Sequence, residues 1–163
     1  MHTLETDRNE AGLRIQVQTE DFDISAAMAA LRSGRTDIGA VAAFVGLMRD
    51  FNDGDTVMSM SLDHYPGMTE RALTGIAEQA RTRWPIDDAV IIHRVGTFIP
   101  GDQIVLVLTA ARHRGDAFSA CEFIMDYLKT EAPFWKKEHT PDGERWVEAR
   151  SSDATARSRW DDA

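Results

Sequence analysis

The residues best suited to chemistry in this sequence are cations placed where secondary-structure elements are expected to end. Arg49 follows a run of small apolar residues, and His113 and Arg114 precede a helical stretch. Lys129 and Lys136 lie on either side of an expected bend. A helix N-terminus adds unpaired backbone N–H groups and a partial positive charge, which favour an anion. A single cation of this kind is usually a solvated surface charge. Together, on a chain of net charge −9, these cations indicate one pocket for a small anion.

All three lysines of the chain lie between positions 129 and 137, namely Lys129, Lys136 and Lys137. Two readings stay open: the composition has drifted toward arginine and left three lysines by chance, or this region needs a flexible, titratable amine. An amine near other cations in a partly buried pocket can donate or accept a proton near neutral pH. It can also stabilise a developing oxyanion or thiolate. The residues alone do not choose among these roles, and Glu138 could either orient Lys136 or neutralise it.

Several familiar catalytic patterns are absent. The sequence has no G-x-x-x-x-G-K-[ST] phosphate loop, no dinucleotide fingerprint after a strand, no G-x-S-x-G and no H-E-x-x-H. The five histidines and the single cysteine lack metal-ligand spacing, so we expect no bound metal. Cys121 falls on an apolar helix face, where cysteine behaves as a small hydrophobe rather than a nucleophile. Asp102, in a Gly-Asp turn, is expected to be structural.

Composition narrows the class of protein. A chain of 163 residues with 43% hydrophobic and 28% charged residues suits one globular domain with a real core. Because the net charge is −9, nucleic acid and anionic membranes are poor partners. No apolar run approaches the roughly 18 residues that span a bilayer. One cysteine excludes an internal disulfide framework and fits a reducing compartment, so we expect the cytoplasm.

The elements that must position these residues can be read from the hydrophobic pattern. Period-two alternation predicts a strand over residues 13–18, and a small-apolar run over 39–48 predicts a strand buried on both faces. A turn at 52–55 leads into a second hairpin strand over 58–62. The other predicted elements are a short helix over 25–32, a helix over 68–84, strands over 89–95 and 103–110, a helix between the 113–114 junction and Pro133, and a hairpin of 134–139 with 144–149.

Hairpins that alternate with helices indicate an α+β fold with a mostly antiparallel sheet and a C-terminal β-hairpin. We expect a single domain over residues 1–150. Residues 151–163 form a polar C-terminal tail, expected to be frayed unless Trp160 docks it.

Several motifs follow one another in the order and spacing of one known family. In sequence letters they are LDHYPGM from 62, HRVG from 93, PGD from 100, HR at 113 with AF at 117, FIMDYLKT from 123, APFWKKE from 132 and RWVEA from 145. This series resembles the large, catalytic subunit of molybdopterin synthase. The resemblance runs from about residue 39 to residue 149.

The resemblance implies an α/β-hammerhead fold and a homodimer at the centre of a heterotetramer. Each large subunit would bind a small ubiquitin-like sulfur-carrier subunit, whose C-terminal Gly-Gly tail ends in a thiocarboxylate. The substrate would be cyclic pyranopterin monophosphate, converted to molybdopterin by two sulfur transfers. The sulfur arrives on the carrier, so the resemblance implies no cofactor bound by this subunit.

The resemblance also implies roles for particular residues. Lys129 would be the main catalytic residue, near the carrier's terminal carbonyl, and Lys136 its assistant. Arg49, His113 and Arg114 would hold the phosphate and the pterin, the last two in the neighbouring subunit's site or in their own. The substrate-binding set thus comprises Arg49, His113, Arg114, Lys129, Lys136 and the adjoining Lys137 and Glu138.

Two other functions stay open on the sequence. A non-catalytic module could bind a ubiquitin-like Gly-Gly tail through the same fold and groove without any pterin. A different transferase could act on a phosphorylated heterocycle with the same cations and no sulfur. Binding of the pterin precursor would distinguish the enzyme from the non-catalytic module. A requirement for a thiocarboxylated partner would distinguish it from the sulfur-free transferase.

Overall fold

The computed structural model describes residues 12–52, 54–147 and 151–161. Predicted strand residues 148 and 149, and the predicted boundary at 150 between domain and tail, lie outside these ranges. Among the described residues, no helix is long and apolar enough to cross a bilayer.

The main sheet has four strands in the order β1-β6-β8-β2. The strands are β1 (Leu13–Gln18), β6 (Ile86–Arg94), β8 (Gln103–Ala111) and β2 (Ala40–Leu47). Only β1 runs parallel to its neighbour, β6; the β6–β8 and β8–β2 pairs are antiparallel. The runs of Val, Ile, Leu and Ala in β6 and β8 are buried on both faces, as expected for central strands covered on both sides.

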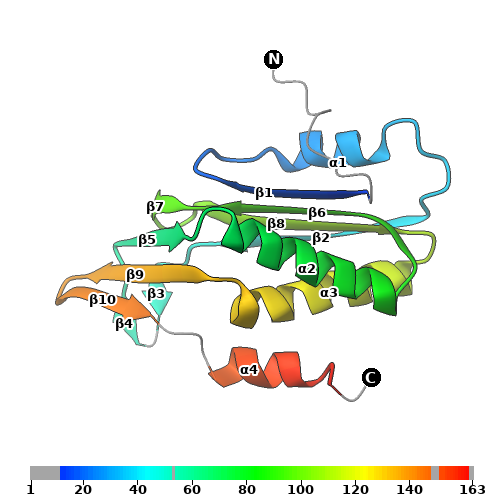
Figure 1. Cartoon of the computed structure of the whole chain (residues 1–163). Helices are drawn as coiled ribbons and strands as arrows, with labels where there is room; N and C mark the ends of the chain where they lie inside the picture. Colours follow the sequence, from blue (N-terminus) through cyan, green and yellow to red (C-terminus); the bar gives the residue numbers. More distant parts are fainter. Residues whose placement is uncertain (1–11, 53, 148–150, 162–163) are drawn as a thin grey trace.

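Helices cover both faces of this sheet (Figure 1). On one face lies α1 (Ile24–Arg32), which Asp23 caps by accepting a hydrogen bond from the Ala26 amide. On the other face lie α2 (Met68–Arg83) and α3 (Arg114–Glu131), and the larger apolar core fills the space between them and the sheet. This core contains Leu73, Ile91, Val107, Phe123 and Ile124.

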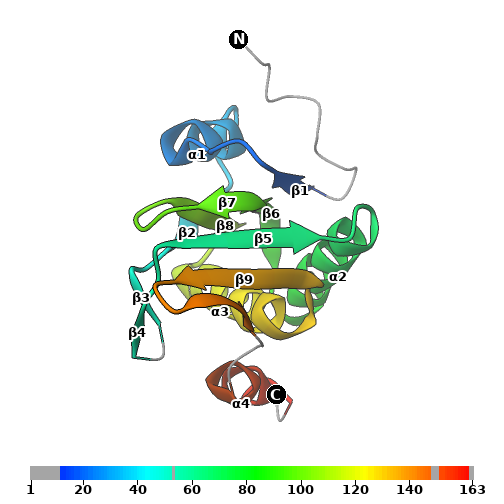
Figure 2. The same cartoon turned by 90° about the vertical axis from the view of Figure 1, so that its left-hand side faces the viewer.

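A second, antiparallel sheet stands at one end of the main sheet, in the order β10-β9-β5-β7 (Figure 2). Its strands are β5 (Ser59–His64), β7 (Gly96–Phe98), β9 (Phe134–Thr140) and β10 (Gly143–Val147), and a small hairpin of β3 (Phe51–Asn52) and β4 (Asp55–Thr56) precedes it. The β9–β10 pair is the predicted C-terminal hairpin. The α+β class with mostly antiparallel pairing is thereby confirmed.

Two expectations about the strands are wrong. The strand over 58–62 is not a hairpin partner of 39–48, because β5 pairs with β7 and β9 whereas β2 pairs with β8. Nor is the small-apolar run of β2 buried on both faces: β2 is an edge strand, and Phe44 and Leu47 are 38% and 55% exposed. The prediction was wrong because an apolar run shows only that a strand is suited to being covered. It does not show whether the covering layer belongs to the same chain or to another one.

The part of the predicted tail that the structure describes, residues 151–161, is folded rather than frayed. Its residues form α4 (Ser151–Ser158), which lies against α3 (Figures 1 and 2). Trp160 docks it, with its ring edge-on to Trp84 and Phe123 at 5.3 and 5.5 Å and its Nε1 donating to Asp126 at 2.7 Å.

Candidate active site

A cavity of about 410 Å³ opens between the two sheets and the end of α3. Its walls are formed by the ends of β2 and β6, the inner faces of β5 and β9, and the last turn of α3. Its polar lining residues are Arg49, His93, Lys129, Thr130, Lys136, Glu138 and Asp153. A volume of this order suits a small heterocyclic ligand.

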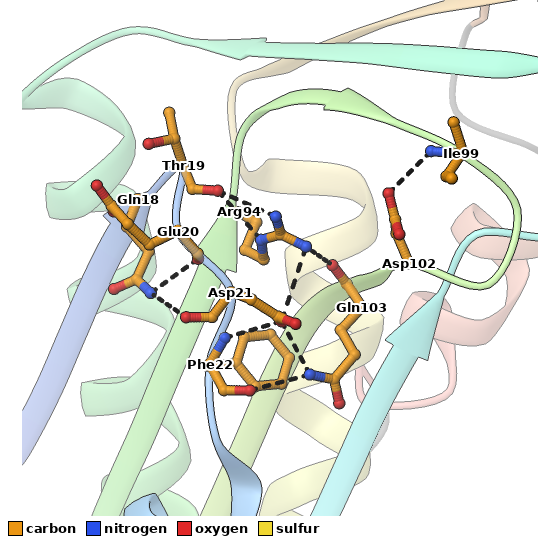
Figure 3. Close-up of polar contacts among 9 residues, drawn as sticks. All are labelled: Gln18, Thr19, Glu20, Asp21, Phe22, Arg94, Ile99, Asp102 and Gln103. Atoms are coloured by element: carbon orange, nitrogen blue, oxygen red, sulfur yellow. Dashed lines mark hydrogen bonds and ion pairs between the residues drawn. The ribbon is translucent and has the colours of Figure 1, made fainter.

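Arg49 lies in the cavity wall because the residue before it, Met48, is hydrogen-bonded through both its amide and its carbonyl to the turn at residues 99–102. The Met48 amide donates to the Asp102 carbonyl at 2.9 Å, and the Gly101 amide donates to the Met48 carbonyl at 2.8 Å. Asp102 also accepts a hydrogen bond from the Ile99 amide through Oδ2 (Figure 3). Gly101 adopts a φ of 94°, which L side chains rarely tolerate. Asp102 is therefore structural, as predicted, and the turn positions Arg49.

Lys136 and Glu138 reach the cavity because side chains alternate along β9. Both line it, together with their cross-strand neighbours Leu62 and Met60 on β5. The Glu138 carboxylate is 2% exposed and lies 3.1 Å from the Arg145 guanidinium and 3.9 Å from the Lys136 amine. A buried carboxylate between two cations both orients Lys136 and balances its charge.

Lys137 points to the opposite face of β9. Its amine lies 2.6 Å from a Glu144 oxygen and 5.2 Å from the centre of the Trp146 ring. It does not line the cavity of its own chain. Its predicted part in substrate binding stays a prediction that this geometry does not support.

Lys129 lies in the last turn of α3 and lines the same cavity as Arg49 and Lys136. Residues 80 positions apart in sequence thus meet around one space, as the pattern of cations indicates. Three cations facing one concave surface favour an anionic ligand, and a guanidinium suits phosphate through paired hydrogen bonds.

His113 and Arg114 lie elsewhere in the chain. His113 is the N-cap of α3 and Arg114 its first residue, both exposed. Lys129 follows Arg114 by 15 residues on one helix, so a rise of about 1.5 Å per residue separates them by about 22 Å. These two residues cannot reach the cavity of their own chain. Their predicted part in the site stays a prediction that requires a second copy.

His93 belongs to the cavity, although the sequence reasoning did not select it. It lies near the end of β6, is 5% exposed, and stacks on Phe134 with ring centroids 3.9 Å apart. Burial, and further the charges of Lys129 and His64, lower its pKa from 6.5 to about 4, against a hydrogen bond to the Arg94 carbonyl that raises it. The side chain is therefore neutral at physiological pH. The available signal was its place in the HRVG motif, directly after the apolar run Ala89 to Ile92 of β6.

Asp153 was also missed, because it belongs to a segment expected to be frayed. It lies in α4 and lines the cavity. The docked tail therefore closes one side of the site.

Cys121 is an inert core thiol, as predicted. It is 7% exposed, and burial raises its pKa to about 11. No cluster of three or more potential metal ligands occurs within the described ranges.

Comparisons with known proteins agree with the resemblance drawn from the motifs. The model of the MoaE protein family matches residues 17–131. A molybdopterin synthase catalytic subunit from Ralstonia nicotianae is 62% identical over 146 residues, which cover 90% of this chain and 83% of the relative. The solved structure of a molybdopterin biosynthesis MoaE protein from Burkholderia ambifaria is 60% identical, with a TM-score of 0.78 and coverage of 93% of this chain and 98% of that one.

A more distant structure, from Helicobacter pylori, shares the fold at 20% identity and a TM-score of 0.68, covering 86% of this chain and 93% of its own; it is described as a complex of subunits 1 and 2 of molybdopterin-converting factor. Because the family model spans well over half of the sequence and the relatives align along most of it, the chain belongs to the MoaE family of molybdopterin synthase catalytic subunits.

Proposed function

We propose that this chain converts cyclic pyranopterin monophosphate to molybdopterin by two sulfur transfers from the C-terminal thiocarboxylate of a small ubiquitin-like carrier subunit. The observation that carries the proposal is the convergence of Arg49, Lys129 and Lys136 on one cavity of about 410 Å³. No resident cofactor is needed, because the sulfur arrives on the carrier. The reducing cytoplasm would suit both this chemistry and the lone cysteine.

Each cation has a defined task in this reaction. Arg49, fixed at the end of β2, would bind the cyclic phosphate through its planar guanidinium. Lys129 and Lys136 would stabilise the negative charge that develops on sulfur and oxygen as the thiocarboxylate is consumed. Glu138 would keep the Lys136 amine facing the cavity. The cavity is open on the Lys129 side, since Lys129 itself is exposed, so an extended tail could approach that amine.

A carrier partner is supported by the fold relative from Helicobacter pylori, which is described as a two-subunit complex. The need for a partner also follows from the chemistry. The described cavity contains no nucleophilic sulfur, because Cys121 is buried in the core and does not line it.

A homodimer is supported by apolar surface that the single chain leaves uncovered. Phe118, one turn from Arg114 on α3, is 65% exposed, and Phe44 and Leu47 on the neighbouring edge strand β2 are 38% and 55% exposed. Strand β2 also packs beside α3 and leads to Arg49. A second copy on this face would cover the apolar residues and bring its own His113 and Arg114 toward a site they cannot otherwise reach.

The proposal is tested by converting purified substrate with and without thiocarboxylated carrier. Lys129→Ala should reduce turnover by at least about a hundredfold while leaving carrier affinity within a few-fold of wild type. Lys129→Arg keeps the charge but not the compact amine, so it should recover little activity. Arg71→Ala removes an exposed cation from α2 and serves as the matched control.

Full turnover by the Lys129→Ala variant would remove the catalytic assignment. A chain that binds the carrier but shows no calorimetric signal with the pterin precursor, even with carrier present, would instead be a Gly-Gly-tail-binding module.

A further inference from the structure

His93 is a buried imidazole that faces the cavity without an evident structural need for its second nitrogen. Its Nδ1 lies 2.9 Å from the Arg94 carbonyl oxygen. A carbonyl can only accept, so Nδ1 carries the proton and donates. Nε2 is then the nitrogen with the free lone pair. Within the described ranges, Nε2 makes no hydrogen bond to the protein, and His93 lines the cavity.

The ring is held rigidly in this orientation. Phe134 stacks on it at an interplanar angle of 21°. The carbonyl that receives its Nδ1 proton belongs to Arg94, whose guanidinium donates to the Thr19 carbonyl and to the Gln103 carbonyl (Figure 3). Because these bonds fix the residue that orients the imidazole, the Nε2 lone pair keeps a constant direction.

The surroundings also keep the lone pair available. Lys129 on α3 and His64 on β5 are the titratable groups that act on the imidazole, and both disfavour its protonation. The remaining wall beside it, Phe134 on β9, is apolar. In a cavity lined by cations, His93 is thus a neutral acceptor placed next to an aromatic face.

We propose that His93 is a substrate-binding residue whose Nε2 accepts a hydrogen bond from an N–H group of the substrate's heterocycle. This inference rests on the proposed function and assigns the two ends of the ligand. Arg49 takes the phosphate end, Lys129 and Lys136 keep their place beside the reacting sulfur, and the neutral acceptor beside Phe134 takes the donor edge of the ring. A ligand must then carry both an anion and a correctly placed N–H, which is a stronger filter than charge alone.

The test compares three variants of His93 in the full chain with carrier present. Phe keeps the stack on Phe134 and removes both nitrogens, Asn keeps a donor toward the Arg94 carbonyl but has no acceptor at the Nε2 position, and Gln places its carbonyl oxygen near that position. We expect His93→Phe and His93→Asn to bind cyclic pyranopterin monophosphate about tenfold more weakly, and His93→Gln to stay within about threefold of wild type.

Inorganic phosphate is the second probe, because it can contact the cations but offers no ring N–H. Its affinity, measured by competition, should not change in any of the three variants. If His93→Phe does not fold, the His93→Asn and His93→Gln variants still test the proposal. Both carry the same amide group, and they differ in whether its carbonyl oxygen reaches the Nε2 position.

Equal pterin affinity for Asn and Gln, or a parallel loss of phosphate affinity, would overturn the proposal. So would a fall in kcat with unchanged pterin binding, which would assign His93 to positioning Lys129 instead. A wild-type chain that binds the pterin through His93 but transfers no sulfur would refute the proposed function and leave this inference standing.

Discussion

At the scale of single residues, the site combines cations that face the cavity with a buried carboxylate, Glu138, that pairs with one of them, Lys136. Glu138 is nearly inaccessible and lies against Arg145 and Lys136, so its charge is matched within the wall rather than by solvent. A buried carboxylate of this kind is tolerated only when it is paired. His93 is the neutral member of the same wall.

The neutral state of His93 makes a prediction about acid stability. Its pKa is about 4 in the folded chain and 6.5 when unperturbed, so the unfolded chain takes up a proton at higher pH than the folded one. The free energy of unfolding therefore holds its full value above pH 6.5 and falls as the pH drops toward 4. His93→Gln cannot titrate, so between pH 6.5 and 4 it should lose less stability than wild type, by up to roughly 3 kcal/mol.

Urea denaturation of both proteins at several pH values across this window measures the difference. The carboxylates titrate in both proteins and cancel in the comparison. Parallel pH profiles for the two proteins would show that His93 is not buried in its neutral form.

The residues that the sequence could identify are those whose type alone implies chemistry. The sequence pointed to three cations, Arg49, Lys129 and Lys136, and to Glu138 as the partner of Lys136. The fold brings all four to one cavity. His93 could not be selected on chemistry, because a histidine in an apolar strand has the same pattern whether its ring is packed in the core or open to a cavity. That distinction depends on which elements leave a space at the end of β6.

At the scale of elements, helices were more predictable than strand pairing. The 3.6-residue spacing gave α2 within a residue, and α3 begins at Arg114, where His113 and Arg114 were expected to stand at the start of a helix. The partners of β2 and β5 were not predictable, because pairing is decided between segments far apart in the chain. The same limit applies to α4, whose polar sequence gave no helical stripe and whose position depends on one aromatic side chain.

Trp160 should control whether α4 stays docked. Trp160→Ala removes its contacts with Trp84 and Phe123 and its hydrogen bond to Asp126, so the free energy of unfolding should fall by about 3 kcal/mol. Amide hydrogen exchange in residues 151–158 should become fast while α3 stays protected. The matched control is Trp146→Ala, since that tryptophan is 68% exposed and its loss should cost less than about 1 kcal/mol. Unchanged protection of α4 in the Trp160 variant would contradict this role.

At the scale of the whole molecule, α3 has a cavity lysine in its last turn and an exposed histidine and arginine at its start. Within a single chain, only the C-terminal end of α3, with Lys129, contributes to the cavity. The exposed apolar residues of β2 and α3 lie between Arg49 and Arg114, where a second copy would be needed to complete the site.

Mixing two inactive variants tests whether that second copy contributes. Lys129→Ala and Arg114→Ala should each be inactive alone. If Arg114 acts across a dimer, each mixed dimer contains one site with both residues intact, so an equal mixture after subunit exchange should recover about a quarter of wild-type activity. If both residues act within one chain, no mixture recovers activity. The check is a turnover assay on the mixed sample, with each variant alone at the same total concentration as the control.

The alternation along β9 restricts how this protein could change length over evolution. The strand carries lysines at two consecutive positions, and only the one on the inner face meets the cavity. Inserting or deleting one residue within β9 ahead of Lys136 would exchange the two faces, turning the Glu138 carboxylate outward and Lys137 inward. The tip of the β9–β10 hairpin, at 141–142, is free of this restriction, so extra residues are expected to be tolerated there.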